Sequence, residues 1–481
     1  MNRKMVWYTI GRIVWLEGVL LLLPLAVSLL YREYACAAAF GVTIGVAAVI
    51  GAPLALLRTK NRVIYAREGF TIVAVAWIVM SVIGALPFVI SGQIPSYIDA
   101  FFETVSGLTT TGSSILHHVD RLGHGIAFWR SFTHWIGGMG VLVLMMAVLP
   151  TDSGRSMHIM RAEMPGPVVG KLVPRIRDTA KILYLIYIGL TVLETVLLLC
   201  GGMPLFDSLI HAMGTAGTGG FGIKPDSLAG YSPYLQWVVT VFMLLFGVNF
   251  NLYFLLLIGR VKSFFKSREL WCYVGIFLAA ATLITANIYR LYPTVGESVR
   301  QAAFQTSSIL TTTGYATADF NRWPLLSQAI LFLLMFIGGC AGSTAGGLKV
   351  SRVILLFKMI RREFKRMLHP NAVGSVQLEG KALDTVTLHS VATYFALFIL
   401  CQVVIFLSLC ILNSFDLTTN LTATAATFNN IGPGLAGVGP AANYAAFSPV
   451  SKLILSASML LGRLEIYPLL LTFSPSVWRK K

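Results

Sequence analysis

The 481-residue chain carries apolar side chains at 56% of its positions and charged side chains at only 12%. Soluble globular domains carry about 25% charged residues, so a row of ordinary soluble domains is excluded, and we expect an all-α polytopic membrane protein. The 37 Lys and Arg residues outnumber the 20 Asp and Glu residues, and the net charge is +17. Such an excess can indicate a nucleic-acid partner or a membrane topology, and the placement of the basic residues decides between them.

Ten apolar runs are long enough to cross a bilayer, which takes about 20 residues. In chain order they lie near residues 6–30, 35–57, 70–91, 126–150, 182–202, 233–258, 271–290, 325–357, 386–412 and 450–473. An even number of crossings returns the chain to the side on which it began. The sequence therefore predicts ten membrane-spanning helices with both termini on one side.

Basic residues gather in alternate connections between these runs. Of the 37 Lys and Arg residues, 28 lie at the two termini or in the connections 58–67, 151–181, 260–268 and 349–381. The positive-inside rule makes that face cytoplasmic. Orientation and anionic lipid account for the basic excess, so we expect a lipid membrane and no nucleic acid as partner.

Four copies of one pattern lie in the connections on the opposite face. They read TVSGLTTTGS (104–113), AMGTAGTGGF (212–221), TSSILTTTGY (306–315) and TAATFNNIGP (424–433). Each follows a short, partly apolar segment, and these segments begin near Asp99, Asp207, Glu297 and Asp416. A single copy is equally well explained as a polar hairpin turn. Four copies, each between two spans and each after a segment too short to cross, favour a structural repeat.

Non-helical backbone at membrane depth is tolerated only where protein buries it or water reaches it. Four helix/pore-loop/helix units arranged pseudo-fourfold around one pore satisfy that condition. The predicted divisions are an N-terminal pair of membrane helices (1–66) and four pore units (67–150, 151–259, 260–358 and 359–481).

The turn residues are uncharged, which suits a filter that replaces the hydration shell of a potassium ion by backbone carbonyl dipoles. Glycine permits the backbone conformations that such a filter needs, and each short helix directs its negative C-terminal end toward the pore centre. The predicted filter comprises Thr110, Thr111, Gly112, Thr218, Gly219, Gly220, Thr312, Thr313, Gly314, Asn430, Ile431 and Gly432.

At these residues the chain resembles the Trk/Ktr/HKT superfamily of potassium transporters, and within it the bacterial TrkH-type subunits. The resemblance extends to FWRSFTHWIGGMG (128–140), GGCAGSTAGGLKVSR (338–352) and GRLEIYP (462–468). It implies a homodimer in the bacterial cytoplasmic membrane and a separately encoded cytoplasmic ring of TrkA type, which binds the regulatory nucleotide. Gly at all four filter positions is associated in this superfamily with potassium selectivity. The second and fourth copies depart from TTTG, so the expected ring is only approximately symmetric.

The stretch Gly338–Gly347 is a poor helix interior, because each Gly costs about 1 kcal/mol relative to Ala. It favours either close helix packing by small residues or a movable intramembrane gate, and the resemblance places a loop here, beneath the filter. The predicted gate residues are Gly338, Gly339, Gly342, Ser343, Thr344, Gly346, Gly347 and Lys349.

Arg463 is a second gate candidate, because an arginine inside a span costs about 2.5–3.5 kcal/mol on insertion scales. The alternative is a structural pair with Glu465 or another carboxylate, although side chains two residues apart on a helix do not face each other. The resemblance implies that the Arg463 side chain faces the permeation path. Nearer the outer mouth, Glu103, Asp120 and Asp319 are either cation-concentrating groups or ordinary solvated carboxylates.

Together these features predict channel-like potassium uptake, with potassium ions as the only bound cofactor and nothing covalently attached. The first alternative is a symporter that couples potassium to sodium or protons through groups such as Glu194 or His389. A more distant alternative is a non-conducting receptor or assembly subunit. No enzyme is expected, because the sequence has no GxxxxGK[ST] and no HExxH motif. The partner should bind the basic connections 151–181 and 349–381.

Overall fold

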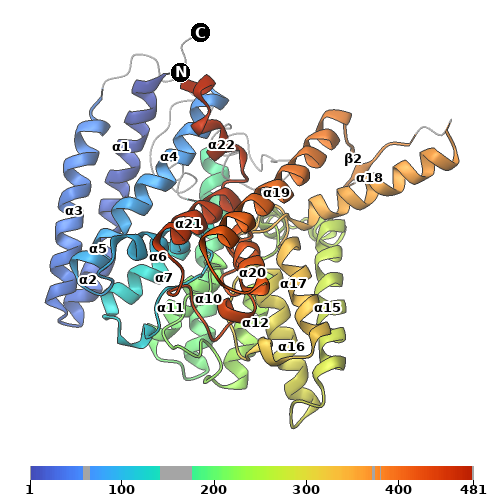
Figure 1. Ribbon diagram of the computed structural model, residues 1–481, viewed down its shortest axis with the longest axis horizontal. Helices are drawn as coiled ribbons and strands as arrows, with labels where there is room; N and C mark the ends of the chain where they lie inside the picture. The colour runs from blue at the N-terminus through green and yellow to red at the C-terminus, as the bar shows by residue number, and fades with distance from the viewer. Residues whose placement is uncertain (1, 58–64, 141–175, 371–373, 380, 479–481) are drawn as a thin grey trace.

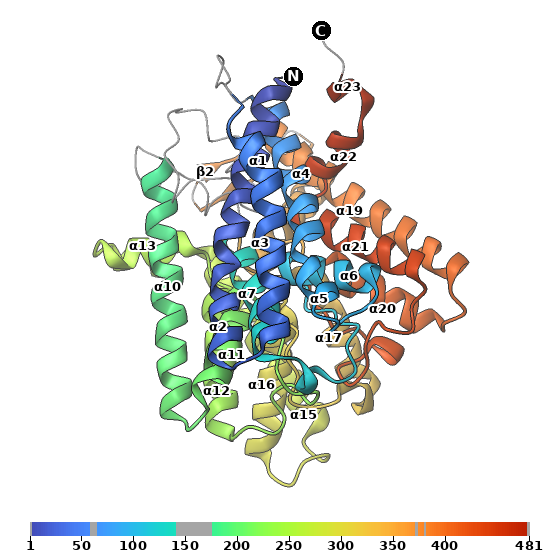
Figure 2. The same ribbon diagram turned by 90° about the vertical axis from the view of Figure 1, so that its left-hand side faces the viewer.

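The structure, a computed structural model, describes residues 2–57, 65–140, 176–370, 374–379 and 381–478. These residues are almost entirely helical, and the only strands among them are the short pair β1 (Gln377–Leu378) and β2 (Lys381–Ala382). The first helix and the last described helix, α23 (Pro475–Trp478), begin and end at the same end of the molecule (Figures 1 and 2). There Arg3 Nη2 donates a hydrogen bond to the Trp478 carbonyl (3.0 Å), so the two ends of the described chain lie together.

An N-terminal helical pair flanks the rest of the molecule. Its first member is made of α1 (Arg3–Leu20) and α2 (Leu22–Leu30), and its second is α3 (Tyr34–Ala55). Helix α1 runs beside α3 in Figure 2. Glycine permits this close approach, since a Cβ on Gly11 would lie closer than 3.0 Å to the backbone of Ala55. The pair joins the remaining helices through α1, which packs on α4 (Ala66–Gly84), and through α2, which packs on α7 (His124–Gly138).

Four segments follow, each with a long helix, a short helix, a turn and a returning helix. The long helices are α4 (Ala66–Gly84) with α5 (Leu86–Ile90), α10 (Ile176–Cys200), α15 (Arg268–Ile288) and α19 (Thr385–Leu412). The short helices are α6 (Tyr97–Leu108), α11 (Leu205–Gly217), α16 (Val295–Leu310) and α20 (Leu417–Phe428). The returning helices are α7, α12 (Pro233–Phe246), α17 (Leu325–Ile337) and α21 (Pro449–Arg463). Short helices are thus found where the sequence predicts them.

Side-chain caps fix the starts of three of the short helices. Ser96, Thr294 and Asp416 each accept a hydrogen bond from the backbone N–H three residues later, which satisfies a donor that the helix leaves free. The hydrogen bond from the Thr419 hydroxyl lowers the pKa of the Asp416 carboxyl, so this cap stays ionised. An anion at a helix N-terminus is also favoured by the helix dipole.

Two of the predicted spans are not straight helices. The run 233–258 is bent by 91° between α12 and α13 (Phe250–Leu257), and the run 450–473 is bent by 120° between α21 and α22 (Tyr467–Phe473). Asn249 caps α13 through its side chain, and Glu465 and Ile466 have positive φ angles. Local backbone conformations that the apolar composition does not reveal therefore break both runs.

The predicted run 325–357 is also divided. Helix α17 ends at Ile337, and α18 (Val350–Leu368) starts only after the glycine-rich stretch and projects from the body of the molecule (Figure 1). Within the described residues, six helices are long and apolar enough to span a membrane, and the two bent pairs raise this number to eight. Since residues 141–175 lie outside the described residues, the count of ten stays a prediction.

Candidate functional site

The four turns at residues 110–112, 218–220, 312–314 and 430–432 share one backbone conformation. The first residue of each has a left-handed φ: 56° at Thr110, 54° at Thr218, 58° at Thr312 and 55° at Asn430. The glycine two residues later also has a positive φ, between 75° and 100°. A non-glycine residue in this region costs on the order of 1–2 kcal/mol, so the surrounding contacts must hold all four turns in place.

Hydrogen bonding at these turns also repeats. In the first turn the Thr110 N–H donates to the Gly107 carbonyl (3.0 Å), and the Thr111 N–H donates to the Ser106 carbonyl (2.8 Å). The equivalent two bonds are present in the other three turns. This pair of bonds is the Schellman motif, which satisfies the last carbonyls of a helix. The four short helices therefore end in the same way, although the second and fourth turns lack the TTTG sequence.

The four glycines lie against one another's turns in a closed cycle. A Cβ on Gly112 would overlap the carbonyl oxygen of Gly219, and one on Gly220 would overlap that of Thr313. A Cβ on Gly314 would overlap the Ile431 carbonyl, and one on Gly432 would lie 2.7 Å from the Thr111 carbonyl. Each turn therefore contacts the next, and the fourth contacts the first. A side chain at any of these positions would displace a neighbouring turn. Glycine is therefore required both because no room exists for a Cβ and because the φ angle is positive.

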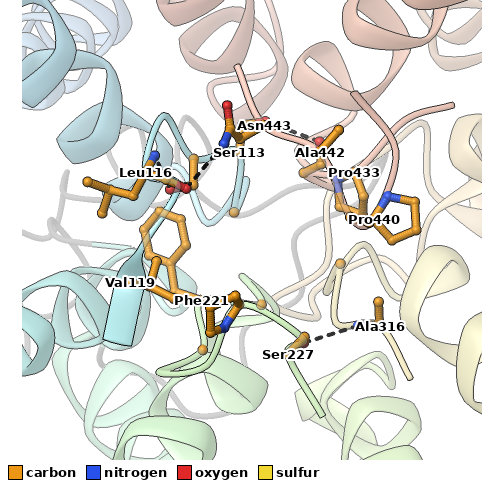
Figure 3. A pocket seen from close by; sticks show the side chains of 18 of the residues that line it. Ser113, Leu116, Val119, Phe221, Ser227, Ala316, Pro433, Pro440, Ala442 and Asn443 are labelled. Atoms are coloured by element: carbon orange, nitrogen blue, oxygen red, sulfur yellow. Dashed lines mark hydrogen bonds between the residues drawn. The ribbon is translucent and has the colours of Figure 1, made fainter. Parts of the chain in front are cut away.

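A cavity of about 160 Å³ opens above this ring, and all four glycines line it. Figure 3 shows Ser113, Phe221, Ala316 and Pro433, which follow the four turns, around the same space. The segment after the third turn is tied to the second by the Ala316 N–H, which donates to Ser227 Oγ (3.2 Å). None of the described residues that line the cavity is acidic. The oxygens of its surface are therefore all neutral and belong to backbone, hydroxyl and amide groups, although the basic residues Arg130 and Lys224 also line it.

Glu103 is neither a cation-concentrating group nor a solvated carboxylate, the two roles that the sequence suggests for it. Its side chain is buried, and Oε1 accepts hydrogen bonds from Arg130 Nε (2.6 Å) and Ser114 Oγ (2.9 Å). Oε2 accepts from the Ile115 N–H (3.0 Å). Arg130 in turn donates to the Gly222 carbonyl (3.1 Å). The pair thus holds the segments that follow the first and second turns.

The other two carboxylates lie nearer the surface. Asp319 caps the 3-10 helix η2 (Phe320–Arg322), where it accepts from the Asn321 N–H (3.2 Å) and pairs with Arg322 (3.3 Å). Asp120 is exposed in η1 (Val119–Arg121). Neither lines the cavity above the ring.

The glycine-rich stretch 338–347 forms a loop directly against the ring. The Gly346 N–H donates to the hydroxyl of Thr312 (2.6 Å), and a Cβ on Gly346 would overlap the Asn429 carbonyl. Positive φ angles at Gly338, Gly342 and Gly347 turn the chain back on itself. Close packing within a continuous helix is therefore excluded, because these residues are not helical.

Hydrogen bonds to neighbouring elements anchor this loop. The Cys340 N–H donates to the Gly247 carbonyl (2.9 Å) at the break between α12 and α13. Glu269 in α15 accepts from the N–H groups of Ala341 (2.7 Å) and Ser351 (3.1 Å). Within the loop, Ser343 Oγ donates to the Cys340 carbonyl (2.7 Å). Of the predicted gate residues, Gly339 also packs closely here, since a Cβ would lie closer than 3.0 Å to Ala345.

The two basic gate candidates both bind carbonyls near the end of the loop. Lys349 is buried, and its ammonium donates to the Ala345 carbonyl. Arg463, at the end of α21, donates to the Thr344 carbonyl (2.8 Å) of the loop. It also donates to the carbonyls of Gly137 (2.6 Å) and Gly138 (2.7 Å), which end α7. Carbonyls at a helix C-terminus lack helical partners and favour a cation.

Glu465, which the sequence offers as an alternative partner for Arg463, pairs with Arg352. The two side chains form a bidentate ion pair (2.7 and 2.9 Å), and the Arg352 guanidinium lies 4.1 Å from the centroid of the Tyr394 ring. The start of α18 is thereby fixed to the break between α21 and α22. Sequence reasoning missed this contact, because 113 residues separate its partners.

Several apolar helices long enough to span a membrane, and a central ring of uncharged turns with a loop beneath it, define a helical membrane transport protein. The family model described as TrkH, cation transport protein, matches residues 38–274 and 274–480. The chain therefore belongs to the TrkH family of cation transport proteins.

Individual relatives match over the whole chain. The Trk system potassium uptake protein TrkH of Salmonella typhimurium is 41% identical over 488 residues, which cover 100% of both chains. The protein of the same name from Halomonas elongata is 35% identical and also covers both chains fully. The crystal structure of the potassium transporter TrkH from Vibrio parahaemolyticus superimposes with a TM-score of 0.89, at 35% identity and 100% coverage of both chains.

Proposed function

We propose that this protein takes up potassium ions across the bacterial cytoplasmic membrane by channel-like permeation through the ring of four turns. The observation that carries the proposal is the cyclic contact of Gly112, Gly220, Gly314 and Gly432 with the carbonyl that precedes the next glycine. The names of the relatives, potassium uptake protein and potassium transporter, agree with it.

The chemistry of the ring suits a dehydrated monovalent cation. Carbonyl dipoles replace the hydration shell without the strong field of a carboxylate. Among the described residues, no group of three or more His, Cys, Asp or Glu side chains is placed to hold a metal ion. The four short helices point their C-terminal ends at the ring, and their dipoles add to the negative potential there. In this proposal residues 110–112, 218–220, 312–314 and 430–432 are the selectivity filter.

The glycine-rich loop and Arg463 are the gate in this proposal. The loop touches the third and fourth turns, so ions that leave the filter meet it next. Its Thr344 carbonyl is bound by Arg463, and a fixed positive charge below the filter opposes a resident cation. Movement of the loop must break this hydrogen bond and the one between Gly346 and Thr312. Gating would then consist of breaking these two hydrogen bonds to open the pore and forming them again to close it.

The remaining features complete the proposal. The pore units 67–150, 151–259, 260–358 and 359–481 surround one pseudo-fourfold pore in each subunit of a homodimer, and both termini are cytoplasmic. A separately encoded regulatory ring of TrkA type binds the nucleotide. It contacts α18, which carries Lys358, Arg361, Arg362, Lys365 and Arg366 on a projecting helix. The other predicted contact, 151–181, lies mostly outside the described residues.

Reconstitution tests the proposal. The purified chain in liposomes is given a potassium gradient with no sodium or proton gradient, and potassium influx is followed under a defined membrane potential. Influx that follows the potassium gradient and the potential supports channel-like uptake. Influx only when a sodium or proton gradient is imposed supports the symporter, for which Glu194 is buried in α10 while His389 is exposed on α19. No flux, even with the regulatory partner added, supports the non-conducting alternative.

A further inference from the structure

The turns differ in the side chains that pack against them and hold their shape. In the first turn the hydroxyls of Thr109 and Thr111 are hydrogen-bonded to each other (2.7 Å). The third turn has the same pair, Thr311 and Thr313 (2.8 Å). The second turn has Gly217 and Gly219 at these two positions and therefore cannot form the pair. Something else must fill the space.

The side chain of His134 fills it. A Cβ on Gly219 would lie closer than 3.0 Å to three atoms of the imidazole, and a Cβ on Gly217 would overlap the His134 backbone. The ring also packs on Phe221, the residue after the turn, with the ring centroids 4.1 Å apart. His134 is fully buried. It thus contacts the second turn from its beginning to its end.

His134 is itself held by the first of the four segments. Its Nδ1 lies 2.8 Å from the Gly107 carbonyl, and since a carbonyl only accepts, Nδ1 carries the proton and donates. Gly107 belongs to the last turn of α6, the short helix that ends in the first turn. A single imidazole therefore joins the end of the first short helix to the second turn.

We propose that His134 is a positioning residue of the filter, which sets the geometry of the second turn and with it the discrimination between potassium and sodium. This inference rests on the proposed function. The imidazole takes the place of the paired threonine hydroxyls that support the first and third turns. It also explains why the second copy reads GTGG, since a threonine at position 219 would collide with the ring.

Gly219 makes a sharp test possible because its φ lies outside the left-handed region that L side chains avoid. The three nearest obstacles to Gly219→Ala are atoms of the His134 ring. Gly220 is the matched control. It lies next in the chain, but its φ is 75° and its nearest obstacle is the Thr313 carbonyl oxygen.

The experiment measures the potassium-to-sodium permeability ratio in proteoliposomes for Gly219→Ala, His134→Ala and the double variant. We expect each single change to lower the ratio at least fivefold, and the double variant to be at least threefold more selective than Gly219→Ala alone. His134→Ala should give no such rescue to Gly220→Ala. A double variant no better than Gly219→Ala, or equal rescue of Gly220→Ala, would overturn the inference.

A second measurement separates this inference from the proposed function. The thermal unfolding midpoint of the same variants in detergent requires no ion flux, and it should fall in Gly219→Ala and recover in part in the double variant. If the wild type conducts no potassium, the proposed function fails, and this stability cycle still decides whether His134 positions the second turn. A midpoint that falls further in the double variant than in either single variant counts against the inference.

Discussion

The guanidinium of Arg463 donates a hydrogen bond of 2.8 Å to the carbonyl of Thr344, although 119 residues separate them in the chain. The same side chain binds the two carbonyls that end α7. One arginine therefore joins the glycine-rich loop to the returning helices of the first and fourth segments. A hydrogen bond to a charged group contributes about 1.5–3 kcal/mol, so these three bonds favour the position in which the loop lies against the ring.

Replacing Arg463 by alanine should release the loop. We expect potassium flux at a fixed driving force to rise about tenfold, since loss of about 1.4 kcal/mol changes an equilibrium by a factor of ten. Flux through proteoliposomes measures it, with Arg260→Ala, an exposed arginine beside α14 (Val261–Phe265), as the control. Unchanged flux from a folded Arg463→Ala protein would show that the arginine does not restrain the loop.

The contact between the Gly346 N–H and the Thr312 hydroxyl gives a second prediction. Thr312→Val keeps the shape of the side chain but removes the acceptor, and a buried N–H without a partner costs about 1–3 kcal/mol. We expect basal flux to rise about threefold to tenfold, while the preference for potassium is retained.

Thr110→Val is the matched control for Thr312→Val. Thr110 holds the equivalent position in the first turn, with φ of 56° against 58°, and within the described part of the chain its hydroxyl has no hydrogen-bond partner. Flux through Thr110→Val should stay within about twofold of the wild type. An equal rise in both variants would mean that valine acts on the turns themselves and not on the loop.

The buried pair of Glu103 and Arg130 should matter for stability. Removing one partner of a buried ion pair costs about 3–5 kcal/mol, because the other charge is left without compensation. Glu103→Ala should therefore lower the thermal unfolding midpoint in detergent by several degrees. Arg322→Ala breaks an exposed pair, which is worth about 0–1 kcal/mol, and should leave the midpoint nearly unchanged. Equal midpoints for the two variants would contradict this account.

The parts of the fold that the sequence reveals are those with local causes. Apolar runs locate the long helices, and the glycine and threonine patterns locate all four turns, because a left-handed residue and a glycine two positions later are local needs. The glycine-rich stretch is predicted for the same reason, since five of its ten residues are glycine, a poor helix former. These features need no knowledge of what lies next to them in space.

The parts that sequence reasoning misses depend on contacts between distant segments. Glu103 meets Arg130 from a different helix, and Glu465 meets Arg352 across 113 residues. Neither pairing has a periodic pattern, because each partner lies on its own element. The support of the second turn by His134 is of the same kind, since the missing threonines are visible in the sequence and the imidazole that replaces them is not.

The cyclic contact of the four glycines is tested most directly by Gly112→Ser, compared with Gly202→Ser. Gly112 and Gly202 both have a positive φ (77° and 83°), but a Cβ on Gly112 would overlap the Gly219 carbonyl, whereas nothing lies within 4 Å of one on Gly202. Both variants therefore carry the same backbone strain, and only one disturbs the ring. The measurement is the potassium-to-sodium permeability ratio of each in proteoliposomes. We predict a fall of at least tenfold for Gly112→Ser and no change for Gly202→Ser, and full selectivity in Gly112→Ser would contradict the assignment of the ring as the filter.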